Sequence, residues 1–180
     1  MPINRTAMID HVDARIAKTD DPRHLALLEM LRAHMTGEVN EDVDALLATI
    51  SPVRQQYRSW GSPEDMQPAS REEIRAFYVE RQALGQLYFQ FDIDRLTVAD
   101  DIIVTDGVMT SLFPGTTVVG MGLRTPRPEA VHEVTIRTII SWPFDEAGLI
   151  VGEETYSVVT GARPLADEEI PADYPAGLVG

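Results

Sequence analysis

The hydrophobic period of this 180-residue sequence changes once, near Gly85, and that change is what most constrains its fold. Before Gly85, apolar residues recur at spacings of three and four, which predicts amphipathic helices. After it, they alternate with polar residues, as in LYFQFDI at residues 87–93, which predicts half-buried strands. Helices followed by a series of antiparallel strands predict an α+β fold, in which one curved sheet wraps around the N-terminal helices.

The boundaries of the predicted elements follow from caps, turns and breakers. Ser70 and Glu73 have capping-box spacing, so a helix should begin there. Gly37 should end an earlier helix, and the segment 145–148 should form a hairpin turn. The expected helices are 8–18, 23–35, 42–50 and one that starts after Ser70, and the expected strands are a short one within 55–60, one from about 87, and 102–113, 131–144 and 149–160.

The domain organisation expected from this pattern is a single α+β domain at residues 22–160. Residues 1–21 form an N-terminal helical extension, and residues 161–180 form a Pro-rich acidic tail without a core of its own. The segment 114–128 is rich in glycine and proline, so we expect a long loop that could reach over a pocket.

Composition excludes several classes of function. The chain has 15 basic and 29 acidic residues and a formal net charge of −14, which argues against binding to nucleic acid or to anionic membranes. It has no cysteine, which excludes thiolate catalysis, and its only lysine is Lys18, which disfavours a Schiff base. It shows neither a secretory signal nor a run of about 20 apolar residues, so we expect a cytoplasmic protein without a membrane partner.

The common catalytic and metal-binding motifs are absent from the sequence. It contains no G-x-S-x-G elbow, no P-loop and no H-E-x-x-H, and its histidines have no short ligand spacing. From sequence we therefore expect neither a metal ion nor a cofactor. The four histidines are His11, His24, His34 and His132.

Three segments, in order, resemble the nuclear-transport-factor-2-like, or SnoaL-like, superfamily. They are MLRAHMTGEVNEDVDALLATISP at 30–52, ASREEIRAFY at 69–78 and IISWPFDEAGLIVGEETYSV at 139–158. The resemblance covers about residues 22–160 and implies a cone-shaped α+β barrel with one deep apolar pocket. It does not fix the function, because this superfamily includes isomerases, cyclases, dehydratases, epoxide hydrolases, lyases and non-catalytic binders.

The resemblance also tests two known reactions against this sequence. It aligns Ile140 with the acidic oxyanion donor of ketosteroid isomerase, His34 with its oxyanion tyrosine, and Arg58 or Tyr57 with its base. The isomerase set is therefore not preserved, which disfavours steroid isomerisation by that mechanism. The epoxide hydrolase pattern also fails, because Thr155 stands where it places a carboxylate beside the last tyrosine.

A different polar set remains in the expected apolar pocket. Glu153 could act as general base, and Arg58 or Tyr57 could stabilise a developing oxyanion. His34 could be a second acid/base, although it and His132 could equally be buried structural histidines. A shift of one residue would turn Glu154 inward in place of Glu153. The candidate catalytic residues are His34, Tyr57, Arg58, His132 and Glu153, and the candidate substrate-binding residues are Leu31, Trp60, Phe89, Phe91, Ile136, Thr138, Ile140 and Thr155.

These residues favour a cofactor-independent acid–base enzyme that acts on a hydrophobic cyclic or aromatic small molecule. Lyase or dehydratase chemistry is preferred over isomerisation, because the residues of the isomerase are missing. The alternatives are a non-catalytic ligand-binding or interaction module, and the small subunit of a larger oxygenase. We also expect a homodimer, because the second face of the sheet, with Thr135 and Ile139, is partly apolar.

Overall fold

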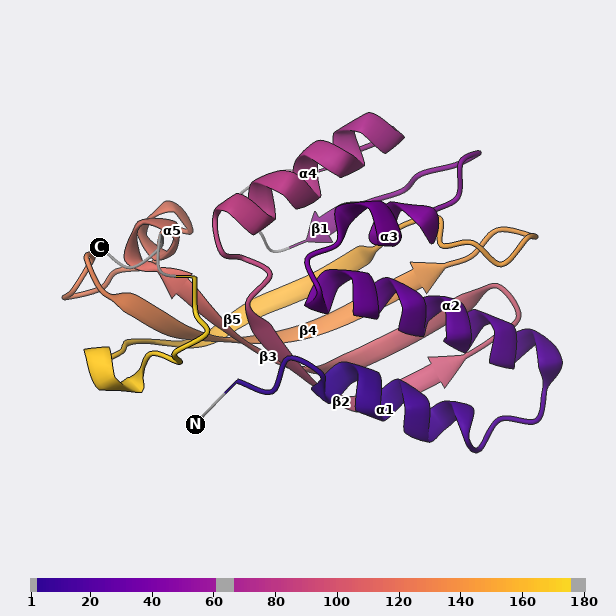
Figure 1. Ribbon diagram of the computed structural model, residues 1–180, viewed down its shortest axis with the longest axis horizontal. Coiled ribbons are helices and arrows are strands. Elements are labelled where there is room, and N and C mark those ends of the chain that lie inside the picture. The colour runs from indigo at the N-terminus through magenta and orange to yellow at the C-terminus, as the bar shows by residue number, and fades with distance from the viewer. Residues whose placement is uncertain (1–2, 61–66, 176–180) are drawn as a thin grey trace.

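The computed structural model describes residues 3–60 and 67–175, and it contains one curved, unclosed five-stranded sheet (Figure 1). The strand order is β1-β5-β4-β3-β2. Four strands pair antiparallel in sequence order, and the short first strand pairs parallel with the last. The strands are β1 (Arg58–Trp60), β2 (Phe89–Val98), β3 (Ile102–Pro114), β4 (Val131–Pro143) and β5 (Glu154–Pro164).

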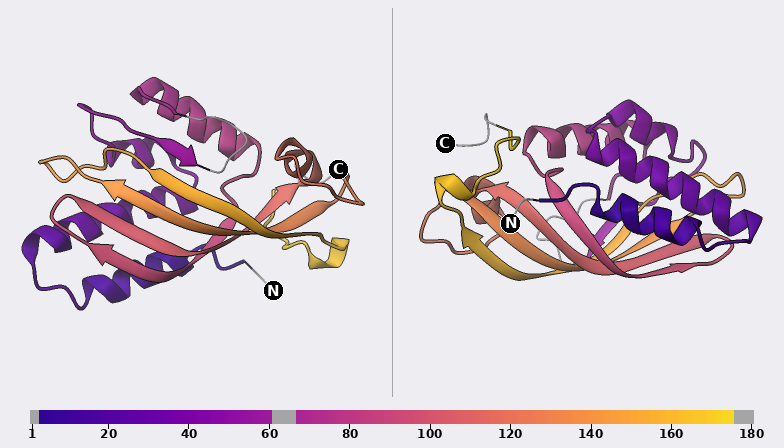
Figure 2. Two further views of the ribbon diagram at one scale, coloured as in Figure 1. Left: turned by 180° about the vertical axis from the view of Figure 1, so that it is seen from behind. Right: turned by 60° about the horizontal axis from the view of Figure 1, so that its bottom comes forward.

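The helices of the N-terminal half lie together over one face of this sheet, which curves beneath them (Figure 2). This arrangement confirms the predicted α+β class and the predicted wrapping of the sheet around the helices. None of the helices in the described ranges has the length and apolar character that a bilayer crossing requires. The helices are α1 (Ala7–Ile16), α2 (Pro22–Val39), α3 (Val43–Ala48), α4 (Arg71–Ala83), α5 (Gly115–Gly120) and the 3₁₀ helix η1 (Asp167–Glu169).

Side-chain caps fix where α2 and α4 begin. The Asp21 carboxylate accepts hydrogen bonds from the backbone amides of Arg23 and His24, each at 2.9 Å. The Ser70 hydroxyl accepts from the backbone amide of Glu73 at 3.2 Å, as the capping-box spacing predicts.

The predicted end of the second helix at Gly37 is wrong. Gly37 lies inside α2, where a Cβ atom would come within 3.0 Å of the Leu46 backbone. Glycine serves here to let α2 and α3 approach each other closely, and it does not terminate the helix. Because α2 therefore continues to Val39, it carries Glu38 into the interior.

The strand pattern places apolar residues on the concave face of the sheet, as predicted. Along β4, the side chains of His132, Val134, Thr138, Ile140 and Trp142 are all buried. The main core joins this face to the apolar stripe of the helices. Its members from the helices include Val12, Leu27, Leu28, Leu31, Met35, Leu46 and Ile74, and those from the sheet include Phe89, Phe91, Ile93, Ile103, Ile140 and Trp142.

The N-terminal helix, the C-terminal tail and the segment 114–128 also contribute to the packing. Helix α1 buries Met8 in the main core. Leu165 and Tyr174 from the predicted tail pack in a second cluster beside Tyr88 of the domain. The predicted long loop at 114–128 contains α5, which is anchored because Val118 packs in a third cluster.

Candidate functional site

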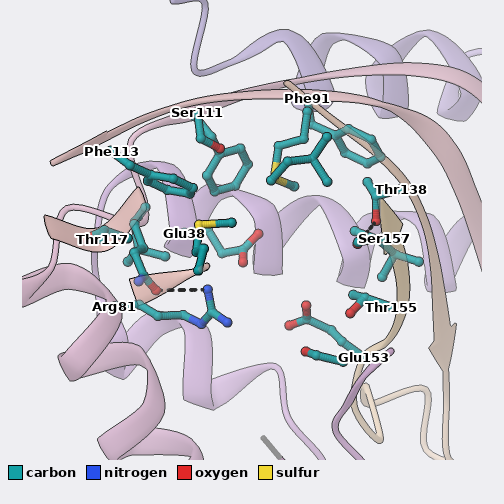
Figure 3. A pocket seen from close by; sticks show the side chains of 18 of the residues that line it. Glu38, Arg81, Phe91, Ser111, Phe113, Thr117, Thr138, Glu153, Thr155 and Ser157 are labelled. Carbon is teal, nitrogen blue, oxygen red and sulfur yellow. Dashed lines mark hydrogen bonds between the residues drawn. The ribbon is translucent and has the colours of Figure 1, made fainter. Parts of the chain in front are cut away.

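A cavity of about 740 Å³ lies between the concave face of the sheet and helices α2, α4 and α5 (Figure 3). Its size is within the range typical of small-molecule sites, and its wall is mainly apolar and aromatic. Residues of the described ranges that form the apolar wall include Met35, Phe77, Leu87, Phe89, Phe91, Met109, Phe113, Met121, Leu123, Ile136, Ile140 and Trp142.

Polar side chains gather on one side of this apolar wall. Glu38 reaches the cavity from the last turn of α2, and Glu153 reaches it from the residue before β5. Tyr78 comes from α4, and its hydroxyl donates a hydrogen bond to Oε1 of Glu153. Tyr57 precedes β1 and completes the group. Four elements that are distant in sequence thus converge on two carboxyl groups.

The two carboxyl groups lie close to each other. An oxygen of Glu38, an oxygen of Glu153 and a ring nitrogen of His34 all lie within 4.8 Å of one another. The side chain of Glu38 is only 8% exposed, and burial raises its pKa well above the usual value. The negative charge of Glu153 raises the pKa of Glu38 further, and nearby Arg81 partly opposes this. Burial and the neighbouring negative charge therefore both favour the protonated form of Glu38.

The two tyrosines beside the carboxyl pair remain protonated. Burial raises the pKa of Tyr57 and of Tyr78 well above 10.0, and the charge of Glu153 raises both further. Each phenol is therefore a hydrogen-bond donor. The Tyr57 hydroxyl is buried, and its contact with the Tyr78 hydroxyl partly opposes the rise in its pKa. Because Tyr57 lines the cavity, its hydroxyl can donate to an oxygen of a bound molecule.

His34 lies behind Glu153 and is fully buried, outside the cavity wall. The Thr49 hydroxyl donates to the backbone oxygen of Leu46 at 2.6 Å, so it accepts from Nδ1–H of His34 at 2.7 Å. This contact directs Nε2 of His34 toward Oε1 of Glu153 at 3.3 Å. With Nδ1–H donated to Thr49, the Nε2–Oε1 contact is a hydrogen bond only when Nε2 or Glu153 carries a proton, and His34 then orients Glu153.

Arg81 supplies the positive charge of the site from α4. Its guanidinium lies 4.2 Å from the centroid of the Phe77 ring, and Nη1 donates to Oε1 of Gln86 at 3.3 Å. Figure 3 shows Arg81 pointing into the pocket on the same side as Glu38. It can therefore stabilise negative charge that develops on the carboxyl pair or on a ligand.

The predicted register of the last strand is confirmed. Glu153 faces the cavity, whereas Glu154 faces outward and accepts from Nε1 of Trp60 at 3.0 Å. Trp60 borders the cavity but is half exposed, and its ring stacks on that of Tyr156. Of the predicted site residues, Tyr57, Trp60, Phe89, Phe91, Ile136, Thr138, Ile140, Glu153 and Thr155 line the cavity.

Besides His34, three predicted site residues do not reach the cavity. His132 is held by the Thr125 hydroxyl at 2.6 Å and the Ala130 backbone oxygen at 2.9 Å, under the segment that follows α5. Arg58 is exposed because its neighbours Tyr57 and Ser59 take the inward positions of the strand. Leu31 is fully buried in the core between helices and sheet. His132 and Arg58 are therefore unavailable to a ligand in this cavity.

Sequence reasoning missed Glu38, Tyr78, Arg81 and Ser111, all of which line the cavity. Glu38 was missed because the helix was expected to end at Gly37. Its signal was the spacing of four from His34, which places both on one helical face. Tyr78 and Arg81 likewise stand three apart and face the same side of α4.

The carboxyl pair also offers donors for a metal ion. His34, Glu38 and Glu153 could together provide one nitrogen and two oxygen ligands, since their donor atoms lie within 4.8 Å of one another. The sequence did not indicate this set, because Glu153 joins the other two only in the folded chain. A divalent ion would take the place of the proton on Glu38.

Comparison with known proteins shows the fold of the chain. No protein-family model and no curated protein matches the sequence. Among solved structures, a candidate SnoaL-like polyketide cyclase from Shewanella putrefaciens is similar with a TM-score of 0.60 and 15% identity, over 82% of this chain and 86% of that one. SalBIII, an epoxide hydrolase/cyclase-like enzyme in pyran ring formation in the polyether salinomycin, gives 0.55 and 10%, over 77% and 95%. An NTF2-like protein from Burkholderia thailandensis gives 0.50 and 22%, over 72% and 88%.

Proposed function

We propose that this chain, which has the nuclear-transport-factor-2-like fold, is a cofactor-independent acid–base enzyme that acts on a hydrophobic cyclic or aromatic small molecule. The observation that carries the proposal is the close pair of Glu38 and Glu153 at the wall of an apolar cavity, where burial favours the protonated form of Glu38. Structural neighbours that include a candidate polyketide cyclase and an epoxide hydrolase/cyclase-like enzyme support a small-molecule enzyme in general.

The pair divides the roles of base and acid between its two members. Glu153, oriented by Tyr78 and His34, takes a proton from a carbon of the substrate. Glu38 gives its proton to the oxygen that leaves from the neighbouring carbon, and water departs as the double bond forms. Tyr57 donates to an oxygen of the substrate on which negative charge develops.

The pair also regenerates itself after one elimination. Glu153 is then protonated and Glu38 is ionised, and their oxygens lie within 4.8 Å of each other. A transfer of the proton from Glu153 to Glu38 restores the starting state without an external acid. An elimination needs a base and an acid at once, which an ionised Glu153 and a protonated Glu38 would supply. An isomerase does not need both, because one base can remove and return the same proton.

Mass spectrometry of products tests this proposal. The protein is incubated with a panel of hydrophobic cyclic and aromatic compounds, beside Glu153→Gln, Glu38→Gln and the matched control Glu154→Gln, whose side chain faces outward. We expect loss of water or of a one-carbon fragment, which the first two substitutions abolish and the control retains.

Other outcomes would identify the alternatives. An unchanged mass with a new retention time would indicate an isomerase, and a gain of water would indicate a hydrolase. No turnover, with ligands that still raise the melting temperature, would favour a non-catalytic binding module. Co-purification with a larger subunit would favour the small subunit of an oxygenase.

A further inference from the structure

Ser111 brings a buried hydroxyl to the cavity wall without a partner. It lies on β3, its side chain is 1% exposed, and it lines the cavity. Its Oγ has no hydrogen-bond partner among residues 3–60 and 67–175. A buried polar group without a partner costs free energy, so its presence calls for an explanation.

The neighbours of Ser111 explain why its hydroxyl stays unpaired. Its partners on the adjacent strands are Phe89 and Val134, which have no polar side-chain atoms. Other hydroxyls on the concave face do have partners. That of Thr138 lies 2.8 Å from the hydroxyl of Ser157.

A second pair on the same face follows the same pattern, since the Thr105 hydroxyl accepts from the Trp142 indole at 3.0 Å. These two pairs show how hydroxyls of the concave face find partners, and Ser111 at the cavity wall has no such partner in the described ranges.

Ser111 and the carboxyl pair lie on different sides of the cavity. In Figure 3, Ser111 lies across the pocket from Glu153, with Phe113 on one side of it and Phe91 on the other. The Tyr57 hydroxyl is also fully buried at the cavity wall, and the charges of Glu153 and Glu38 both act on it. The cavity wall therefore has one buried hydroxyl beside the reacting groups and one, that of Ser111, across the pocket from Glu153.

We infer that Ser111 is a substrate-recognition residue, and that the substrate is a flat, apolar ring system with a neutral oxygen remote from the carbon that reacts at Glu153. This inference rests on the proposed function for the place of reaction only. A serine hydroxyl both donates and accepts, so the remote group is a hydroxyl or a carbonyl. A charged group is excluded, because Phe89, Phe91 and Phe113 offer it no countercharge.

Two naphthalenes that differ in the remote oxygen test the inference. Fluorescence titration compares 2,6-dihydroxynaphthalene with 2-naphthol on the wild type, on Ser111→Ala and on Thr110→Val. Thr110 is the neighbour of Ser111 on β3, and it points to the opposite face of the sheet. We expect the wild type to prefer the diol about ten-fold, or ~1.4 kcal/mol. Ser111→Ala should reduce this preference below about two-fold, and Thr110→Val should retain it.

Stability gives a second readout, because loss of an unsatisfied hydroxyl should leave the melting temperature of the free Ser111→Ala protein equal or higher. A lower melting temperature would show that Oγ has a partner within the protein. That result, an undiminished preference in Ser111→Ala, or failure of both probes to bind would overturn the inference. Because the titration measures binding without turnover, a normal preference in a protein that catalyses nothing would refute the proposed function alone.

Discussion

Substitution of Glu38 by glutamine should remove a pH-dependent destabilisation of the fold. Burial and the charge of Glu153 raise the pKa of Glu38 above its value in the unfolded chain, near 4.5. The folded state then binds the proton more tightly than the unfolded state. Glu38 therefore imposes no penalty below pH 4.5, and it lowers the free energy of unfolding as the pH rises toward the pKa of the folded state. The Gln side chain has nearly the same shape and does not titrate.

The size of the effect follows from a difference of one bound proton. Between pH 4.5 and the folded-state pKa, the free energy of unfolding of the wild type should fall relative to Glu38→Gln by about 1.4 kcal/mol for each pH unit. Arg81, His34, Glu153 and the two tyrosines face the same carboxyl group and are present in both proteins. Glu38→Gln should therefore be the more stable protein at pH 8.

Urea unfolding at several pH values between 4 and 8 measures this difference. Glu154→Gln is the control, because that residue lies on the outer side of the sheet. Parallel pH profiles of the wild type and Glu38→Gln would refute the reasoning, since they would show that Glu38 titrates alike in the folded and unfolded states.

Three further predictions address the supports of the site and the outer face of the sheet. Thr49→Val removes the acceptor for Nδ1–H of His34, so we expect turnover to fall about ten-fold and its pH profile to shift. The control Thr36→Val, on the exposed side of α2, should change neither. Unchanged kinetics in Thr49→Val would exclude His34 as a positioning residue. Gly37→Ala places a methyl group within 3.0 Å of the Leu46 backbone, so it should lower the free energy of unfolding by about 1–3 kcal/mol. A melting temperature equal to that of the wild type would contradict this packing. We propose that the exposed apolar side chains of the outer sheet face join two copies of the chain. Light scattering should then give the mass of two chains for the wild type and of one chain for Tyr156→Lys. A monomeric wild type would exclude the homodimer. That face is formed by Trp60, Ile139, Tyr156 and Val158.

Local sequence patterns were enough to predict the strands of the sheet and which of their residues face inward. Alternation along β4 assigned Thr138 and Ile140 to the cavity, and the hairpin after Phe144 set the register that turns Glu153 inward. These features depend on neighbours in sequence or on one adjacent strand, so period and turn signals determine them.

The remaining site residues depend on contacts that a local pattern does not contain. Gly37 is a residue type that commonly ends helices, and only its close contact with the Leu46 backbone shows that it is there to let α2 and α3 pack together. That misinterpretation concealed Glu38, and with it the carboxyl pair. His132 has the inward parity of its strand, but the segment around Thr125 covers it, so it lies away from the cavity. The alternation of side chains along a strand predicts which face of the sheet a residue lies on, but tertiary packing decides whether that residue reaches the cavity.

The presence of one proton on the Glu38–Glu153 pair is the central claim of the account, and infrared spectroscopy tests it without a substrate. The difference spectrum between the wild type and Glu38→Gln at pH 7 should contain the carbonyl stretch of a protonated carboxylic acid, as expected for a buried acid whose pKa is raised. A difference spectrum with only the bands of an ionised carboxylate would show that Glu38 carries no proton, and it would contradict the assignment of Glu38 as the acid.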